Sequence, residues 1–390
     1  MGMSAQNRRM TGGPFRRPES APGQYDGQGA TVLWERALAV CRSRVADGQH
    51  MAAKLDDERL RRLRLAAQRL TPATAAADVA AAARAVVGVQ AQDVRAAGLA
   101  FRSRVPGLRR VDVDDSGLVR TWTVRGTVHL IDPSDLPWLQ AVVGSRNRAR
   151  FDAAMRKRGD HDVAVGMLND LVALLGERPL DRAGLLRELA ARGHPGLGQR
   201  SINVLMPWAA AQGLIVGLPD GRYRAAQPPA AVDGDLALAT LAHRYLAGYG
   251  PAGAADLASW SGLPLITVRR ALAALDHTEA AGELLALPGT LDATPLPPAP
   301  PALLLAAFDT TMLGYRTREP LVATRDDRHI LPGGGMLRPP VLIDGLAAGT
   351  WTLTAKSKRR TVTIDWFRRN AESAELRAEQ VSVERFLGPG

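Results

Sequence analysis

Two glutamines separated by one small residue are the first candidates for chemistry in this chain. Gln90 and Gln92 follow the apolar run 87–89 and precede Asp93 and Arg95. Amide side chains offer hydrogen-bond donors and acceptors, but they are not strong bases. The pair could therefore position a water molecule or stabilise a developing positive charge. The alternative is a pair of solvated or helix-capping polar residues.

A second candidate is the alternating, β-branched run at 118–131, which has Gly126 in its middle and predicts a strand or hairpin. On a strand, Arg125, Thr127 and His129 would share one face. A basic and polar face of this kind is suited to contact DNA phosphates or the minor groove. The alternative is an ordinary half-exposed strand in which His129 is a satisfied structural residue.

A third group of polar residues follows the apolar run 303–308. Asp309 would lie at the end of a buried strand, with Tyr315 shortly after it. There the carboxylate could orient water or pair with Arg316 or Arg318. The alternative is an ion pair that only holds the loop.

The charge of the whole chain favours a polyanionic partner. The net charge is +11 and the pI is near 10.6, which points first to nucleic acid and second to an anionic membrane. The densest basic run contains Lys356, Lys358, Arg359 and Arg360. This run is either an edge that contacts phosphates or a solvated face, and the overall charge favours DNA contact.

Composition and missing motifs exclude several classes of protein. At 390 residues and 46% hydrophobic content, the chain is expected to form two to four globular domains. The single cysteine, Cys41, excludes an intrachain disulfide and a cysteine-based zinc site, and the scattered histidines predict no metal. No phosphate-binding loop, dinucleotide fingerprint, nucleophile elbow or kinase motif occurs, so we expect no cofactor. Without a long apolar run or a signal core, a cytoplasmic protein with no membrane partner is expected.

Helices followed by short strand pairs are the elements that must position these residues. Helices are expected at about 55–70, 74–86 (Thr74 as N-cap), 93–104, 161–175, 181–192 (Asp181 as N-cap), 199–212, 235–247, 265–275 and 371–382. Strand pairs are expected at 118–131, 213–224 and 341–353, with single strands near 303 and 361. Three helices followed by a β-hairpin are typical of a winged helix-turn-helix domain.

The predicted fold class is α+β, mainly helical, with three tandem winged-helix domains and a C-terminal β-rich segment. The predicted parts are a disordered tail with an uncertain helix at 1–50, winged-helix units at 51–160, 161–230 and 231–290, and the β-rich segment at 291–390. The glutamine pair falls in the first unit.

Five stretches, taken in order, resemble the AlkZ/YcaQ-like family of bacterial DNA glycosylases. They are Val-Gly-Val-Gln-Ala-Gln-Asp-Val-Arg-Ala-Ala at 87–97, Arg-Thr-Trp-Thr-Val-Arg-Gly-Thr-Val-His-Leu at 120–130, and the stretches 249–262, 308–316 and 341–351. The resemblance covers about residues 55–370 and leaves the tail outside. The family divides by whether its motif ends in Gln or Asp, and Gln92 makes this chain resemble the AlkZ-type branch.

The resemblance implies a monofunctional DNA glycosylase with Gln90 and Gln92 as catalytic residues. Its substrates would be bulky N7-alkylguanines and interstrand crosslinks, excised for self-resistance to a genotoxic natural product. The partner would be double-stranded DNA carrying a cationic alkylated guanine, bound by a monomer. DNA contact or site support would come from Asp93, Arg95, Arg125, His129, Asp309, Tyr315, Arg316, Arg318, Lys356, Lys358, Arg359 and Arg360.

Two alternative interpretations keep the same scaffold but assign it no catalytic activity. One is a winged-helix transcriptional regulator, although such regulators are usually symmetric dimers. The other is an architectural DNA-binding protein, which would bind with no preference for a lesion.

Overall fold

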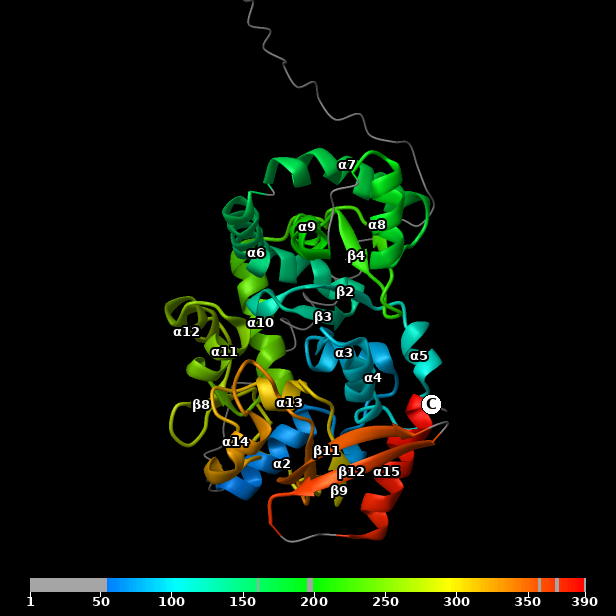
Figure 1. Cartoon of the computed structure of the whole chain (residues 1–390). Coiled ribbons are helices and arrows are strands. Elements are labelled where there is room, and N and C mark those ends of the chain that lie inside the picture. The colour runs from blue at the N-terminus through cyan, green and yellow to red at the C-terminus, as the bar shows by residue number, and fades with distance from the viewer. Residues whose placement is uncertain (1–54, 160, 195–198, 357–358, 369–371, 389–390) are drawn as a thin grey trace, which may run out of the picture. The chain divides into compact units, whose positions relative to one another are not determined.

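The computed structural model describes residues 55–159, 161–194, 199–356, 359–368 and 372–388. The predicted tail, the helix of uncertain attachment and Cys41 therefore lie outside the described residues. The α-helices are α2 (Asp57–Ala67), α3 (Val79–Ala85), α4 (Val94–Arg102), α5 (Arg110–Asp114), α6 (Leu136–Arg158), α7 (His161–Glu177), α8 (Arg182–Ala191), α9 (Gln199–Ala211), α10 (Gly234–Tyr249), α11 (Ala254–Ser261), α12 (Leu265–Ala273), α13 (Thr310–Leu313), α14 (Asp327–Ile330) and α15 (Ala374–Leu387) (Figure 1).

Every strand pairing in the described residues is antiparallel. The strands are β1 (Val89–Gln90), β2 (Val119–Trp122), β3 (Val128–Ile131), β4 (Ile215–Gly217), β5 (Tyr223–Ala225), β6 (Ala252–Gly253), β7 (Thr278–Glu279), β8 (Leu284–Ala286), β9 (Ala302–Leu304), β10 (Pro340–Ile343), β11 (Leu346–Lys356) and β12 (Arg359–Trp366). They form three sheets with the orders β1-β3-β2-β4-β5, β12-β11-β10-β9 and β6-β8-β7.

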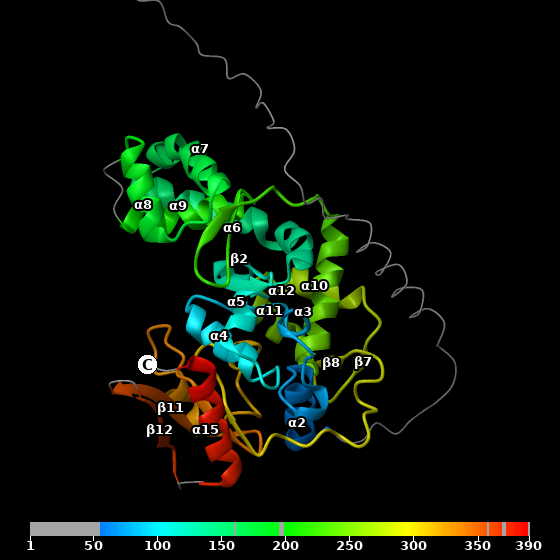
Figure 2. The same ribbon diagram turned by 90° about the vertical axis from the view of Figure 1, so that its right-hand side faces the viewer.

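The five-stranded sheet joins the first two predicted units. β2 and β3 come from the first unit, β4 and β5 from the second, and the link is the pairing of Arg120 with Gly217. The two expected wings are thus continuous, and β1 extends the sheet at one edge. The three helices α10, α11 and α12 accompany the separate β6-β8-β7 sheet (Figure 2). The division into three winged-helix units remains a prediction.

Side-chain caps mark the starts of the helices, and they test the two N-caps that were predicted from the sequence. Asp181 caps α8 as expected, because its Oδ1 accepts a hydrogen bond from the Gly184 backbone at 2.7 Å. The expected cap Thr74 is wrong. The chain 72–74 forms a 3₁₀ turn, and α3 begins after Asp78, whose carboxylate accepts from the Ala81 backbone at 2.7 Å.

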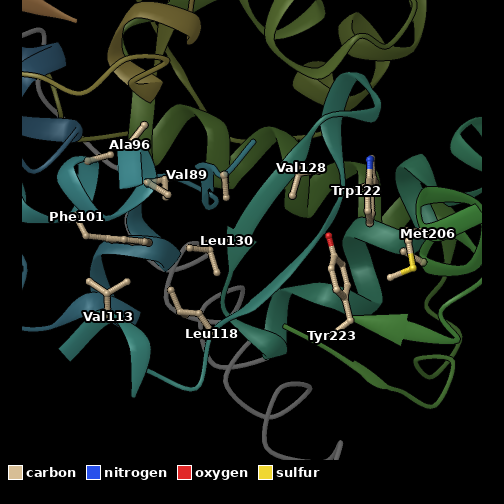
Figure 3. Packing of buried hydrophobic residues seen from close by; sticks show 14 of the residues in the cluster. Val89, Ala96, Phe101, Val113, Leu118, Trp122, Val128, Leu130, Met206 and Tyr223 are labelled. Atoms are coloured by element: carbon tan, nitrogen blue, oxygen red, sulfur yellow. The ribbon is translucent and has the colours of Figure 1, made fainter. Parts of the chain in front are cut away.

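A buried apolar cluster extends along the five-stranded sheet from β1 at one edge to β5 at the other. Figure 3 shows members from β1, α4, α5, β2, β3, α9 and β5, with Phe101 and Leu118 near Leu130 and with Trp122, Met206 and Tyr223 farther along the sheet. The labelled side chains are Val89, Ala96, Phe101, Val113, Leu118, Trp122, Val128, Leu130, Met206 and Tyr223. Because β1 and α4 are both anchored in this core, the short segment between them is held at both ends.

Candidate active site around Gln90 and Gln92

A turn with two residues in the left-handed conformation connects α3 to β1. Val87 has φ 56° and Gly88 has φ 82°, and the Gly88 backbone donates to the Ala83 carbonyl at 2.7 Å. A β-branched residue such as Val87 rarely adopts this conformation, which costs about 1–3 kcal/mol. A side chain at Gly88 would meet Ile131 Cγ2 at 2.5 Å. The chain therefore enters β1 along one tightly packed path.

Gln90 lies on β1 directly opposite His129 of β3. It is half-buried, and its Oε1 lies 3.5 Å from an Arg125 guanidinium nitrogen. Gln92 lies beyond the end of β1 and is exposed. No hydrogen-bond partner of the Gln92 side chain is found among the described residues. One glutamine is thus held by the protein, and the other is available to a ligand.

Asp93 and Arg95 begin helix α4. The Asp93 Oδ1 accepts from the backbones of Arg95 at 2.7 Å and Ala96 at 3.2 Å, so this carboxylate is the N-cap. Arg95 is exposed, and the ion pairs of the described residues do not include it. The Arg95 side chain is therefore accessible to a ligand, whereas Asp93 fixes the segment that carries Gln92.

The alternating pattern predicts Arg125 on a strand face, and this prediction is wrong. Arg125 lies in the turn between β2 and β3. Arg125 has φ 57° and Gly126 has φ 66°, and the Thr127 backbone donates to the Val124 carbonyl at 3.1 Å. Tight hairpin turns with two positive φ angles normally use Asn, Asp or Gly. An arginine here costs about 1–2 kcal/mol, which directs attention to its side chain.

The Arg125 guanidinium bridges two parts of the chain. One nitrogen donates to the Trp260 carbonyl at the end of α11, and the other faces Gln90. Burial lowers the pKa of Arg125, and no carboxylate contributes to the shift. Among the described residues no acidic side chain pairs with Arg125, which is therefore a half-buried cation next to Gln90.

His129 is buried, with 3% of its surface exposed, so it does not present a basic face to DNA. Its Nδ1 lies 2.9 Å from Thr123 Oγ1 and 3.1 Å from the Thr127 carbonyl. Burial, reinforced by the charge of Arg125, lowers the pKa of His129 to about 3. The ring is neutral at physiological pH and supports the strand opposite Gln90, in line with the structural alternative.

Comparison with known proteins assigns this region to a family. The family described as "DNA glycosylase AlkZ-like" matches residues 83–386. The chain belongs to the AlkZ-like DNA glycosylase family. A relative from Streptomyces sahachiroi named "Interstrand DNA cross-link repair glycosylase" is 27% identical in an alignment 341 residues long, and the match covers 76% of this chain and 87% of the relative. The solved structure of the Streptomyces sahachiroi DNA glycosylase AlkZ is similar with a TM-score of 0.68 and 21% identity, covering 86% of this chain and 97% of that one.

In this AlkZ-like chain, Asp309 is placed away from any DNA-accessible surface. Its carboxylate is fully buried and forms a two-pronged ion pair with Arg104, at 2.8 and 2.9 Å. Arg104 Nη2 also donates to Gln68 Oε1 at 3.1 Å, and Asp309 accepts from the Thr311 backbone at 2.9 Å. A direct DNA contact by Asp309 is therefore wrong, and its ion-pair partner is Arg104 rather than Arg316 or Arg318, in line with the alternative of an ion pair that holds the loop. The ion pair instead joins the end of α4 to the start of α13.

Tyr315 and Arg318 are likewise engaged within the AlkZ-like fold. Tyr315 is buried, and its hydroxyl donates to the Tyr249 carbonyl at 2.9 Å. Arg318 forms a two-pronged ion pair with Asp327. A contact of Tyr315 with DNA is therefore excluded, and the charge of Arg318 is neutralised. Arg316 is exposed and forms no ion pair among the described residues.

The basic run lies where β11 turns into β12. Arg360 is half-buried, and its guanidinium donates to the Leu387 carbonyl at the end of α15. A cation at this position also stabilises the helix dipole. Lys358 and the side chains of Lys356 and Arg359 lie outside the described residues, so their predicted DNA contact remains a prediction.

Helix α6, which is not among the helices predicted from the sequence, supports the Arg125 turn. Asn147 is buried on α6 and donates to the Trp122 and Thr123 carbonyls at 3.3 and 3.0 Å. The apolar residues of α6 do not follow one clear stripe, so hydrophobic periodicity does not predict this helix. The signals that were available are the proline at the helix start and Gly159 in a left-handed conformation at its end.

The described part of the chain contains neither a metal-binding cluster nor a membrane-spanning helix. No three His, Cys, Asp or Glu side chains there lie close enough together to hold a metal ion. No helix there is both long and apolar enough to cross a membrane.

Proposed function

We propose that this AlkZ-like protein hydrolyses the N-glycosidic bond of bulky N7-alkylguanines in double-stranded DNA. We extend the proposal to the unhooking of interstrand crosslinks, because the Streptomyces sahachiroi relative is named a cross-link repair glycosylase. A role in self-resistance to a genotoxic natural product follows as part of the same proposal. The observation that carries it is the pair of glutamines, one held beside Arg125 and the other exposed, inside the region that matches the family.

The lesion supplies most of the driving force in this mechanism. Alkylation at N7 places a positive charge on guanine, so the base leaves without strong acid assistance. The enzyme then has to position water at C1′ and stabilise the sugar cation that develops. Neutral amide oxygens are suited to both tasks, and neither task needs a group that titrates near neutral pH.

The two glutamines take different roles at the sugar. The Gln90 Oε1 faces Arg125, so its carbonyl is oriented by the protein. The Gln92 carbonyl is exposed and has no described partner. We assign Gln92 to the attacking water and to the cation, and Gln90 to the positioning of the sugar. The assignment predicts a larger rate loss for Gln92→Ala than for Gln90→Ala.

The test is release of the alkylated base from DNA treated with an N7-alkylating agent, measured by mass spectrometry under single-turnover conditions. Wild type is expected to release alkylguanine from simple, bulky or crosslinked lesions, and the double variant Gln90→Ala with Gln92→Ala to lose release. Gln227→Ala is a matched control, because Gln227 is also exposed and follows β5 at the opposite edge of the same sheet.

Two results would contradict the proposal. If both single glutamine variants release base at the wild-type rate, the assignment of the active site is wrong. If wild type binds DNA but releases no base from any of these substrates, a regulator or architectural protein explains the chain better. The proposed monofunctional chemistry is checked in the same samples, because hydrolysis alone leaves an intact abasic strand without a nick.

A further inference from the structure

A second feature adjoins Arg125, the residue whose guanidinium faces Gln90. It is a pocket of about 610 Å³ between the β2–β3 turn, α6 and the turn that joins α11 to α12. This volume is in the range of small-ligand sites, roughly 300–1,000 Å³. The pocket is lined by Arg125, Gly126, Val143, Arg146, Asn147, Ala149, Arg150, Ser261, Gly262 and Leu263. Arginines and apolar residues therefore share one hollow.

The three arginines of the pocket have no carboxylate partner in the part of the chain that the structure describes. Ion pairs with carboxylates are common among the other arginines, such as Arg109 with Asp112 and Arg318 with Asp327. Arg125, Arg146 and Arg150 belong to none of the ion pairs in the described part of the chain, and no acidic residue lines the pocket. Three like charges in one hollow repel one another unless an anion joins them.

Arg125 and Arg150 are also held in place before any ligand binds. The Arg150 guanidinium donates to the Arg125 carbonyl at 2.6 Å, while the Arg125 guanidinium donates to the Trp260 carbonyl. Gly126 leaves the space that Arg150 occupies, because a Cβ there would lie 2.6 Å from Arg150 Nη1. Each guanidinium keeps further N–H groups for a ligand. The geometry is that of a preorganised anion site.

We propose that this pocket binds one backbone phosphodiester of the DNA strand whose sugar lies at Gln90. The inference rests on the proposed function for its ligand, since DNA is the polyanion that the glutamines act on. Guanidinium groups form strong, charge-assisted hydrogen bonds with phosphate oxygens. Val143 and Leu263, which are largely buried, form the apolar wall of the pocket behind the arginines.

The bound phosphate would also change the electrostatics at the glutamines. Arg125 lies 3.5 Å from the Gln90 Oε1, and its charge alone disfavours a sugar cation at that position. A phosphodiester between Arg125, Arg146 and Arg150 offsets that charge. The site then accepts a cation only when a DNA strand, rather than a free base or nucleoside, is bound.

The salt dependence of DNA binding tests the proposal without relying on catalysis. Each phosphate neutralised by the protein contributes about 0.9 to the slope of log affinity against log salt. We compare wild type with Arg146→Gln, Arg150→Gln and the double variant on an unmodified duplex. Both residues are exposed, so these variants are expected to fold, which thermal melting verifies. Arg109→Gln is the control, because it removes one exposed arginine that already has a carboxylate partner.

One shared phosphate predicts a specific pattern. The double variant loses about tenfold in affinity and about 0.9 in slope, and the two single variants together lose more than the double variant does. Replacing both residues by lysine restores most of the slope, because the charge is kept. The control keeps the wild-type slope.

Two results would overturn the proposal that this pocket binds one phosphate. An unchanged slope in the double variant means that no phosphate binds there, and a loss of about 1.8 means two independent surface contacts. Failure of the proposed function is a separate result, because wild type would then release no alkylguanine whatever the salt slopes are.

Discussion

The burial of His129 makes a quantitative prediction about stability and pH. The folded protein holds this imidazole neutral with a pKa of about 3, whereas the ordinary value is 6.5. Below about pH 6.5 the unfolded chain binds a proton at this position that the folded chain does not. The folded pKa is depressed, so the free energy of unfolding falls as the pH falls. The loss is about 1.4 kcal/mol for each pH unit, or about 2 kcal/mol between pH 7 and pH 5.

The change that isolates this effect is His129→Asn, which keeps a donor for the Thr127 carbonyl and removes the titration. Urea denaturation of wild type and variant over this pH range gives the two slopes. The variant pays a constant penalty for lost packing, so the difference in slope is the readout. Carboxylates with depressed pKa values, such as Asp309, lose their contribution to stability only when the pH falls below their ordinary pKa of about 3.8. The pKa of His243 is also lowered, but this residue is present in both proteins, so its effect on stability cancels in the comparison. Parallel curves for the two proteins would refute the neutral, buried histidine.

Three further outcomes follow from the same geometry. Asp309→Asn leaves the Arg104 guanidinium buried without its counter-charge and is expected to cost about 3–5 kcal/mol in urea denaturation; normal stability with loss of base release would instead return Asp309 to the active site. In Arg125→Asn, relief of about 1 kcal/mol of turn strain offsets the lost hydrogen bond to Trp260, so we expect the melting temperature to change little. Base release is expected to fall at least about tenfold. A matching loss of stability and of base release would argue for a structural role only. Gly88→Ala is expected to lower stability and base release together, because its Cβ would meet Ile131, whereas Gly107→Ala, also at positive φ but in open space, keeps base release; retained release in Gly88→Ala would show that the path into β1 does not position the glutamines.

Much of the local structure was predictable because its signals are local. The alternating run at 118–131 forms the hairpin β2–β3, and the Pro-Asp-Gly turn joins β4 to β5 as expected. The start of α8 was found from Asp181, since an N-cap is read from a few adjacent residues. The start of α3 was misplaced because Thr74 and Asp78 compete as caps, and only packing decides between them.

The parts that could not be predicted depend on contacts between distant residues. Arg104 and Asp309 are separated by 205 positions, and nothing near Asp309 in the sequence indicates that its partner is Arg104 rather than Arg316 or Arg318. The shared sheet depends on a single pairing between Arg120 and Gly217. Arg125 was expected on a strand, because an arginine in a left-handed turn position is contrary to the usual sequence rule. This departure from the rule lies beside Gln90, where a functional reason for it is available.

The electrostatics around Gln90 connect the fold to the chemistry. Glycosidases that cleave neutral sugars use two carboxylates, one to protonate the leaving group and one to stabilise the cation. Here the residues facing Gln90 are a neutral histidine and an arginine, and the neighbouring Asp93 caps α4. A site of this kind has little means to protonate a base or to stabilise a sugar cation with its own charge. It is consistent with a substrate that brings both charges, a cationic guanine as leaving group and backbone phosphates as counter-ions.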